Sequence, residues 1–144
     1  MILTLTIDAF WGAYLENPCT RVIEIEEHAC LYDLHDAIQD AVGFGRDHPF
    51  MFFLANSSSP YARKQWLSEE EEWEDKEDDF YRIRLSDIWP TGRKKLFYLF
   101  DFGDKWTFAV RKERGTKEPE PGVTYPRLIK VMGPNPEQYP RWEE

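Results

Sequence analysis

Three side chains in this sequence combine residue types and positions that suit chemistry on a bound molecule. His48 precedes an apolar stretch that we expect to form a strand, and a histidine at a strand end can act as a general base or a metal ligand near neutral pH. Asp101 and Asp104 flank a Phe-Gly pair, so two carboxylates could hold a cation or a basic group. His48, Asp101 and Asp104 are therefore the candidate catalytic residues of a hydrolase or metal-dependent enzyme, provided that they converge on one point at about 3 Å each.

The same residues also have a structural interpretation. Gly103 permits a positive φ in a tight turn, and Asp101 or Asp104 can accept hydrogen bonds from the amides of that turn. His48 can bond to neighbouring backbone groups in a similar way. The residue types alone fit both interpretations.

A second candidate site lies between Arg93 and Arg114, where seven basic and three acidic residues are interleaved with aromatic rings. In proteins that bind single-stranded nucleic acid, such rings stack on bases while Lys and Arg contact phosphates. We expect Phe97 and its neighbours to belong to the core, so this function requires an exposed Trp106. The candidate binding residues are Trp106, Lys105, Arg111, Lys112 and Arg127.

Cysteine and histidine are sparse. Cys19, His28, Cys30 and His35 match no zinc-site spacing. We expect buried thiols, with His35 at the edge of the core, and neither a metal nor a cofactor.

The net charge of −9 is concentrated in one segment. Residues 69–79 hold nine acidic residues and one basic residue, which leaves the rest of the chain nearly neutral. Runs of like charge usually form solvated loops, so we expect an acidic loop at about residues 56–79 within a single domain spanning residues 1–144. The total charge argues against a protein that binds nucleic acids in general. This argument is weaker than the total suggests, because one loop carries nearly all of the negative charge.

Hydrophobic periodicity predicts the elements that position these residues. Alternation predicts strands at 3–7 and 21–27, and an apolar stripe from Leu34 to Val42 predicts a helix that Gly43 ends. A turn is expected at 85–90. Further strands are expected at 50–54, 80–84, 95–101, 105–112 and 124–131. The expected fold is α+β, with one main helix packed on a mixed or antiparallel sheet of about five to six strands, in the order ββα and then strands.

Targeting and membrane signals are not evident. Met1–Asp8 carries no basic residue for a signal peptide, and the apolar runs are far shorter than the roughly 20 residues of a membrane-spanning helix. We expect a cytoplasmic protein without membrane association.

Three segments, in this order, resemble the plasmid pRiA4b ORF-3-like family. The first runs through residues 34–52 and includes a Gly-Phe step and His48. The second is Phe100-Asp101-Phe102-Gly103-Asp104-Lys105-Trp106, which is similar to the family's Tyr-Asp-Phe-Gly-Asp-x-Trp hairpin. The third is Tyr125-Pro126-Arg127-Leu128, similar to its Tyr-Pro-Arg-Cys block. The resemblance implies a grasp-like sheet around one helix.

What the resemblance implies about activity is limited. Family members are bacterial, archaeal and plasmid proteins, some of them carried on insertion elements, without an established biochemical role. Leu128 stands where the family has a cysteine, and a second family cysteine is replaced near Asn135, so chemistry that used those thiols is not expected here.

We therefore expect a non-enzymatic binding or interaction module of mobile-element-associated type, whose partner is a protein or a nucleic acid. The alternatives are the enzyme centred on His48, Asp101 and Asp104, and a nucleic-acid-binding accessory that uses the basic and aromatic hairpin at 93–114.

Overall fold

The computed structural model of this chain describes residues 1–12, 15, 17, 19–45, 50–57, 59, 61–67, 80–100 and 105–136. In chain order its elements are β1 (Ile2–Trp11), β2 (Cys19–Glu26), α1 (Leu31–Val42), β3 (Phe50–Ala55), β4 (Gln65–Trp66), α3 (Leu85–Ile88), β5 (Lys95–Phe100), β6 (Trp106–Lys112) and β7 (Arg127–Met132).

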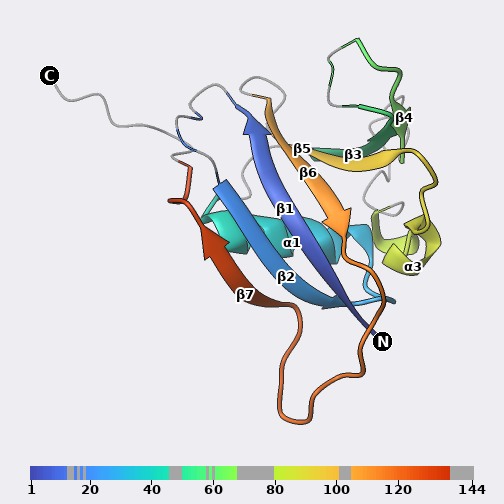
Figure 1. Ribbon diagram of the computed structural model, residues 1–144, viewed down its shortest axis with the longest axis vertical. Helices are drawn as coiled ribbons and strands as arrows, with labels where there is room; N and C mark the ends of the chain where they lie inside the picture. The colour runs from blue at the N-terminus through green and yellow to red at the C-terminus, as the bar shows by residue number, and fades with distance from the viewer. Residues whose placement is uncertain are drawn as a thin grey trace, which may run out of the picture.

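The seven strands form one sheet in the order β4-β3-β5-β6-β1-β2-β7, and every pairing in it is antiparallel (Figure 1). β1 lies inside the sheet, between β2 and β6. The expected count of five to six strands is too low, and the expected choice between mixed and antiparallel pairing resolves to antiparallel. The extra strand is β4, which lies inside the segment expected to be a loop. It pairs with Phe53 and Leu54 of β3.

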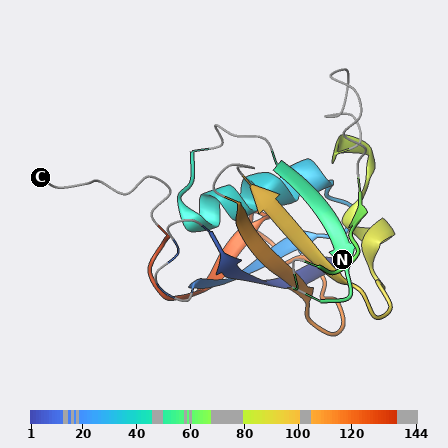
Figure 2. The ribbon, with the colours of Figure 1, turned by 90° about the horizontal axis from the view of Figure 1, so that it is seen from above.

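The helix α1 lies against one face of this sheet (Figure 2). Its apolar stripe, including Leu34 and Ile38, is buried in the same cluster as the inward side chains of β1, β2, β5 and β6. Cys30 is the N-cap residue, and its backbone amide donates a hydrogen bond to Asp33. The helix ends as expected at Gly43, which has a φ of 75°.

Two segments differ from the expected elements. Residues 80–82 form a helical turn rather than a strand, since this turn lets Phe80 pack on Phe50, with ring centroids 4.6 Å apart. The last strand begins at Arg127 rather than Thr124, after Pro126, which has no amide hydrogen to donate to a neighbouring strand. The turn expected at 85–90 contains the short helix α3.

The sheet face away from α1, here called the outer face, is divided into two ends. At the aromatic end, outward residues of β3, β5 and β6 form a second small apolar cluster around Phe53 and Phe97. At the polar end, β1, β2 and β7 carry polar side chains, and the segment between β6 and β7 lies beside them. Backbone hydrogen bonds between Ile2 and Lys117 attach that segment to the edge of β1.

A buried arginine connects β2 to the end of α1. Arg21 is 1% exposed and lies on the inner face. Its guanidinium donates hydrogen bonds to the carbonyl oxygens of Thr20, Ala41 and Met132 and to the side chain of Asn135. The carbonyl of Ala41 belongs to the last turn of α1, where a positive charge is favourable. Arg21 thereby ties Met132 of β7 and Asn135, which follows it, to the core.

Within the described part of the chain, no helix is long and apolar enough to cross a membrane.

Candidate functional site

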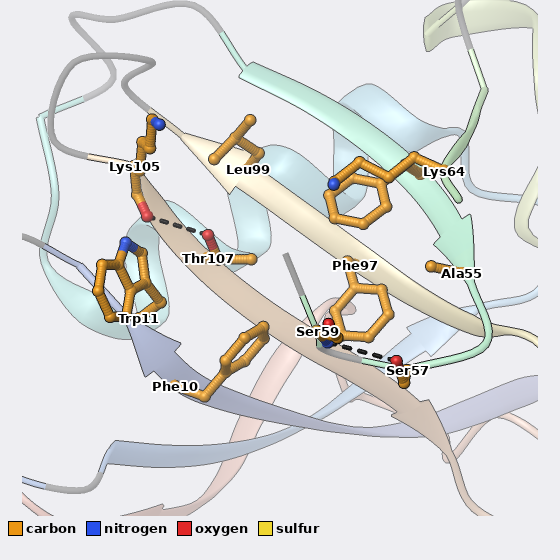
Figure 3. Close-up of a pocket in the computed structure, with 11 residues that line it drawn as sticks. Phe10, Trp11, Ala55, Ser57, Ser59, Lys64, Phe97, Leu99, Lys105 and Thr107 are labelled. Atoms are coloured by element: carbon orange, nitrogen blue, oxygen red, sulfur yellow. Dashed lines mark hydrogen bonds between the residues drawn. The ribbon is translucent and has the colours of Figure 1, made fainter. Parts of the chain in front are cut away.

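The outer face is hollowed at its aromatic end, forming a cavity of about 470 Å³ that we call the aromatic pocket (Figure 3). Its size lies within the range of about 300–1,000 Å³ that is usual for small-molecule sites. The residues that line it are Phe10, Trp11, Phe53, Ala55, Ser57, Ser59, Lys64, Phe97, Leu99, Lys105 and Thr107.

The floor of the aromatic pocket is buried and its rim is exposed. Phe53 and Phe97 are stacked with ring centroids 5.2 Å apart, and both side chains are buried. Phe10 meets Phe97 edge-on at 5.7 Å. Phe10 and Trp11 are 37% and 60% exposed. Buried rings that contact each other hold a fixed shape, whereas the exposed ones offer surface to a ligand.

A bulge in β1 brings the two rim residues together. Ala9 pairs with Phe108 and Trp11 with Thr107, so Phe10 is the extra residue between them. Neighbouring residues of a regular strand point to opposite faces, but a bulge redirects one of them. Phe10 and Trp11 can therefore both line the same pocket.

Positive charge lies beside the rings. Lys64 Nζ is 5.6 Å from the centroid of the Phe53 ring, a cation–π distance. Next to the pocket is a second cavity of about 360 Å³, here called the basic hollow. It is lined by Asn56, Arg63, Lys64, Gln65 and Lys94. Among the described residues, neither lining contains Asp or Glu.

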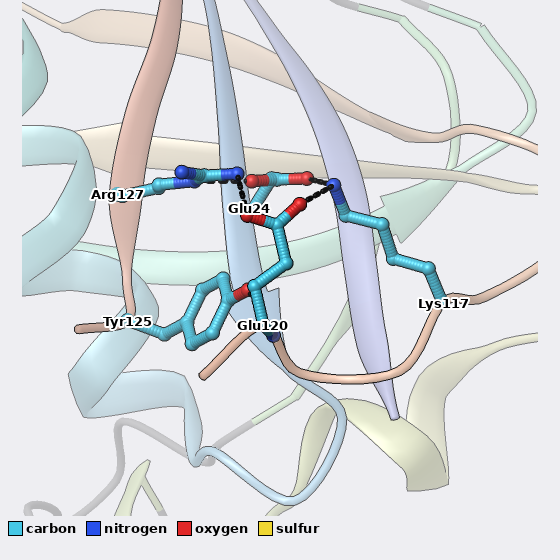
Figure 4. A network of polar contacts seen from close by, with 5 residues as sticks. All are labelled: Glu24, Lys117, Glu120, Tyr125 and Arg127. Atoms are coloured by element: carbon cyan, nitrogen blue, oxygen red, sulfur yellow. Dashed lines mark hydrogen bonds and ion pairs between the residues drawn. The ribbon is translucent and has the colours of Figure 1, made fainter. Parts of the chain in front are cut away.

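The polar end of the outer face holds an ion cluster instead (Figure 4). The carboxylate of Glu24 is 2% exposed and accepts hydrogen bonds from Lys117 and from Arg127 Nε, the latter at 2.5 Å. Glu120 lies 3.5 Å from Arg127. The hydrogen bond from Lys117 lowers the pKa of Glu24 below its ordinary value, against the opposing effect of burial, and the pKa values of both partner bases are raised in turn.

The inner face contains a buried polar group that sequence reasoning placed at the edge of the core. His35 is 3% exposed, its Nδ1 lies 2.5 Å from the hydroxyl of Tyr98, and its ring stacks on Phe50 at 3.7 Å. Gln39 donates to the same hydroxyl at 2.9 Å. These contacts satisfy polar atoms inside the core.

Both cysteines are free and buried, as expected. Burial raises the pKa of each thiol, and the Cys30 Sγ donates to Asp33. No group of three His, Cys, Asp or Glu side chains in the described ranges could hold a metal ion.

The candidate catalytic residues His48, Asp101 and Asp104 lie outside the described residues, and so does most of the expected acidic loop. The candidate binding residues have separate locations. Lys105 lines the aromatic pocket, and Arg111 is exposed on the same strand as Trp106. Lys112 donates to the carbonyl oxygens of Glu113 and Gly115.

The prediction that Trp106 is an exposed binding residue is wrong. Its side chain is fully buried, because it alternates with Phe108 and Val110 on the inner face and packs on Phe44. A Cβ at Gly12 would lie 2.2 Å from its ring, so only glycine fits at that position. The exposed ring that the nucleic-acid hypothesis required is therefore not supplied by Trp106. Arg127 is likewise engaged, by Glu24.

Sequence reasoning missed most of the aromatic pocket. Of its lining, only Lys105 was a candidate binding residue, and Phe97 and Leu99 were assigned to the core. One signal was present: Phe10 and Trp11 are two consecutive aromatic residues at the end of an alternating strand, which breaks the period of two.

Comparisons with known proteins identify a relative in sequence, a shared fold and a family. A protein of Sinorhizobium fredii (strain NBRC 101917 / NGR234), "Uncharacterized protein y4hQ", is 32% identical over 101 residues, which cover 69% of this chain and 47% of that protein. The chain thus spans about half the length of this relative.

A solved structure described as "Protein of Unknown Function MM3350" from Methanosarcina mazei Go1 shares the fold, with a TM-score of 0.67 and 24% identity. The similarity covers 90% of this chain and 68% of that one. The family described as "Plasmid pRiA4b ORF-3-like protein" matches residues 13–138, and the chain belongs to this family.

Proposed function

We propose that this protein is a single-domain binding module whose ligand occupies the aromatic pocket. The observation that carries the proposal is the combination of a buried ring floor with an exposed aromatic rim, on a part of the sheet that the described residues leave open. Exposed apolar surface costs free energy in water, at roughly 25 cal/mol per Å², and contiguous patches of it usually mark binding sites.

The charges of the pocket support a binding role more than a catalytic one. The polar side chains in its lining are two lysines and three hydroxyl-bearing residues, Ser57, Ser59 and Thr107. The described lining has no carboxylate or imidazole that could serve as a general base. The ligand is expected to be apolar or aromatic where it meets the floor and anionic where it meets Lys64 and Lys105.

The experiment is a titration of the full chain with indole, a small aromatic probe, followed by two-dimensional amide NMR. Resonances of pocket residues on β3, β5 and β6 should shift together and saturate. In Thr107→Phe the larger side chain should fill the cavity and abolish those shifts. Arg111→Phe is the matched control, because it adds a ring to the same strand at a position that lines neither cavity. Shifts spread over the whole surface, or unchanged binding in Thr107→Phe, would contradict the proposal.

A further inference from the structure

The aromatic pocket and the basic hollow share one residue, Lys64. Its ammonium group lies 5.6 Å from the centroid of the Phe53 ring, which forms part of the pocket floor. A ligand group that rests on Phe53 therefore has a cation beside it, at the border of the second cavity. The two cavities can hold two parts of one molecule.

The aromatic pocket fits a planar ring with polar edges. The stacked floor of Phe53 and Phe97 provides apolar contact, and Trp11 at the rim is exposed enough to cover a ring from the side. The Ser57 hydroxyl accepts a hydrogen bond from the Ser59 amide, which orients one polar group within the lining. A purely aliphatic ligand would make no use of these hydroxyl groups.

The basic hollow fits a compact anion. Arg63, Lys64 and Lys94 line it, and Lys94 is held by a 2.6 Å hydrogen bond to Gln65. Three of the five residues that line it are basic, in a chain with 27 acidic and 18 basic residues. Phosphate carries more charge than a carboxylate and accepts several charge-assisted hydrogen bonds, including those of a planar guanidinium.

A planar ring and a phosphate occur together in a nucleotide. We propose that the two cavities together bind a nucleotide, with the base in the aromatic pocket and the phosphate in the basic hollow. This inference rests on the proposed function, because it uses the same pocket. The same chemistry is presented by a free nucleotide and by a residue of single-stranded nucleic acid, and the experiment separates these two sources.

The first experiment compares ligands by isothermal titration calorimetry on the full chain. The probes are adenosine 5′-monophosphate, adenosine and inorganic phosphate. The nucleotide should bind at least about tenfold more tightly than either part alone, since each part fills only one cavity. Equal affinity for adenosine and its monophosphate would overturn the inference.

Variants then assign each part of the ligand to its cavity. Arg63→Ala and Lys64→Ala should each weaken nucleotide binding about tenfold and leave adenosine binding nearly unchanged. Trp11→Ala should weaken both ligands by the same factor. Lys130→Ala is the charge-matched control, since it removes an exposed base that lines neither cavity. An equal loss in Lys130→Ala and Arg63→Ala would contradict the inference.

A short oligodeoxyadenylate distinguishes the two sources. Tighter binding than the monophosphate, lost in Arg63→Ala, identifies a nucleic-acid strand as the ligand, and equal or weaker binding identifies a free nucleotide. If indole saturates the pocket while no nucleotide binds, the inference fails and the proposed function stands. If neither indole nor a nucleotide binds, both fail.

Discussion

The two ends of the outer face differ in what lies over the strands of the sheet. At the polar end the chain uses its own segment between β6 and β7, and Lys117 and Arg127 neutralise Glu24. At the aromatic end the described residues leave a cavity above Phe53 and Phe97. Ion pairs within the chain therefore occupy the polar end, whereas the aromatic end holds the cavity in which we propose that a ligand binds.

The comparison shows that the buried ion pairs and the exposed aromatic side chains lie at opposite ends of one sheet. Glu24 is 1% exposed as a residue and forms ion pairs with Lys117 and Arg127, so we expect its charge to affect stability. The rim residues of the pocket are exposed aromatic groups that contribute little to the core. Substitutions at the two ends should consequently affect different measurements.

The largest effect is expected at the pocket floor. Phe97 is 1% exposed and contacts both Phe53 and Phe10, so Phe97→Ala should lower the free energy of unfolding by about 3–5 kcal/mol. Urea denaturation followed by circular dichroism measures this loss. A loss below about 1 kcal/mol would show that the floor is not part of the folded core.

A smaller effect is expected at the polar end. Glu24→Gln keeps the shape of the side chain but removes the charge that Lys117 and Arg127 contact, and should cost about 1–2 kcal/mol because both bases are partly exposed. Thermal unfolding should show the midpoint lowered by a few degrees. Glu120→Gln is the control, since its side chain is 53% exposed, and should change the midpoint little.

The charge of Glu24 also predicts a pH dependence. Its pKa is lowered in the folded protein, chiefly by the hydrogen bond from Lys117, so its contribution is fully present above the unfolded value of about 4.5. That contribution to stability is lost as the pH falls from about 4.5 through the lower pKa that Glu24 has in the folded protein. Between pH 6 and pH 3, wild-type protein should therefore lose more stability than Glu24→Gln. Parallel curves for the two proteins would contradict the assignment.

The smallest effect on stability is expected at the pocket rim. Trp11 is 60% exposed, so Trp11→Ala should change the free energy of unfolding by no more than about 0.5 kcal/mol. The same variant should weaken indole binding in the NMR titration severalfold. This contrast with Phe97→Ala sharpens the distinction between floor and rim. If Trp11→Ala unfolded more easily but bound indole normally, the assignment of Trp11 to the rim would be contradicted.

The sequence predicted the regular elements well where periodicity decides the outcome. The two apolar faces of β5 and the alternation of β6 are confirmed, as is the end of α1 at Gly43. β4 was missed because two residues carry no periodic signal, and its strand state depends on pairing with Phe53 and Leu54. The helical turn around Phe80 was missed because packing on Phe50, which is 30 positions earlier in the chain, decides its conformation.

The candidate site was less predictable. The alternation that makes β6 a strand also places Trp106 on the inner face, which excludes an exposed ring at this position. The pocket itself depends on the register that sets Phe53 opposite Phe97, and on a bulge that adds Phe10. Register and bulges arise from long-range pairing, which no local pattern in the sequence reveals.

The position of β1 has a consequence for how the protein is made. Residues of β1 pair with residues of β2 that are 10 to 24 positions later in the chain. The other edge of β1 pairs with β6, about a hundred residues later. During synthesis the first hairpin is therefore complete while one long apolar edge of it has no partner, a state open to pairing with other chains. Productive folding depends on release of the final third of the chain, and fragments that end before Trp106 should aggregate rather than accumulate as folded domains.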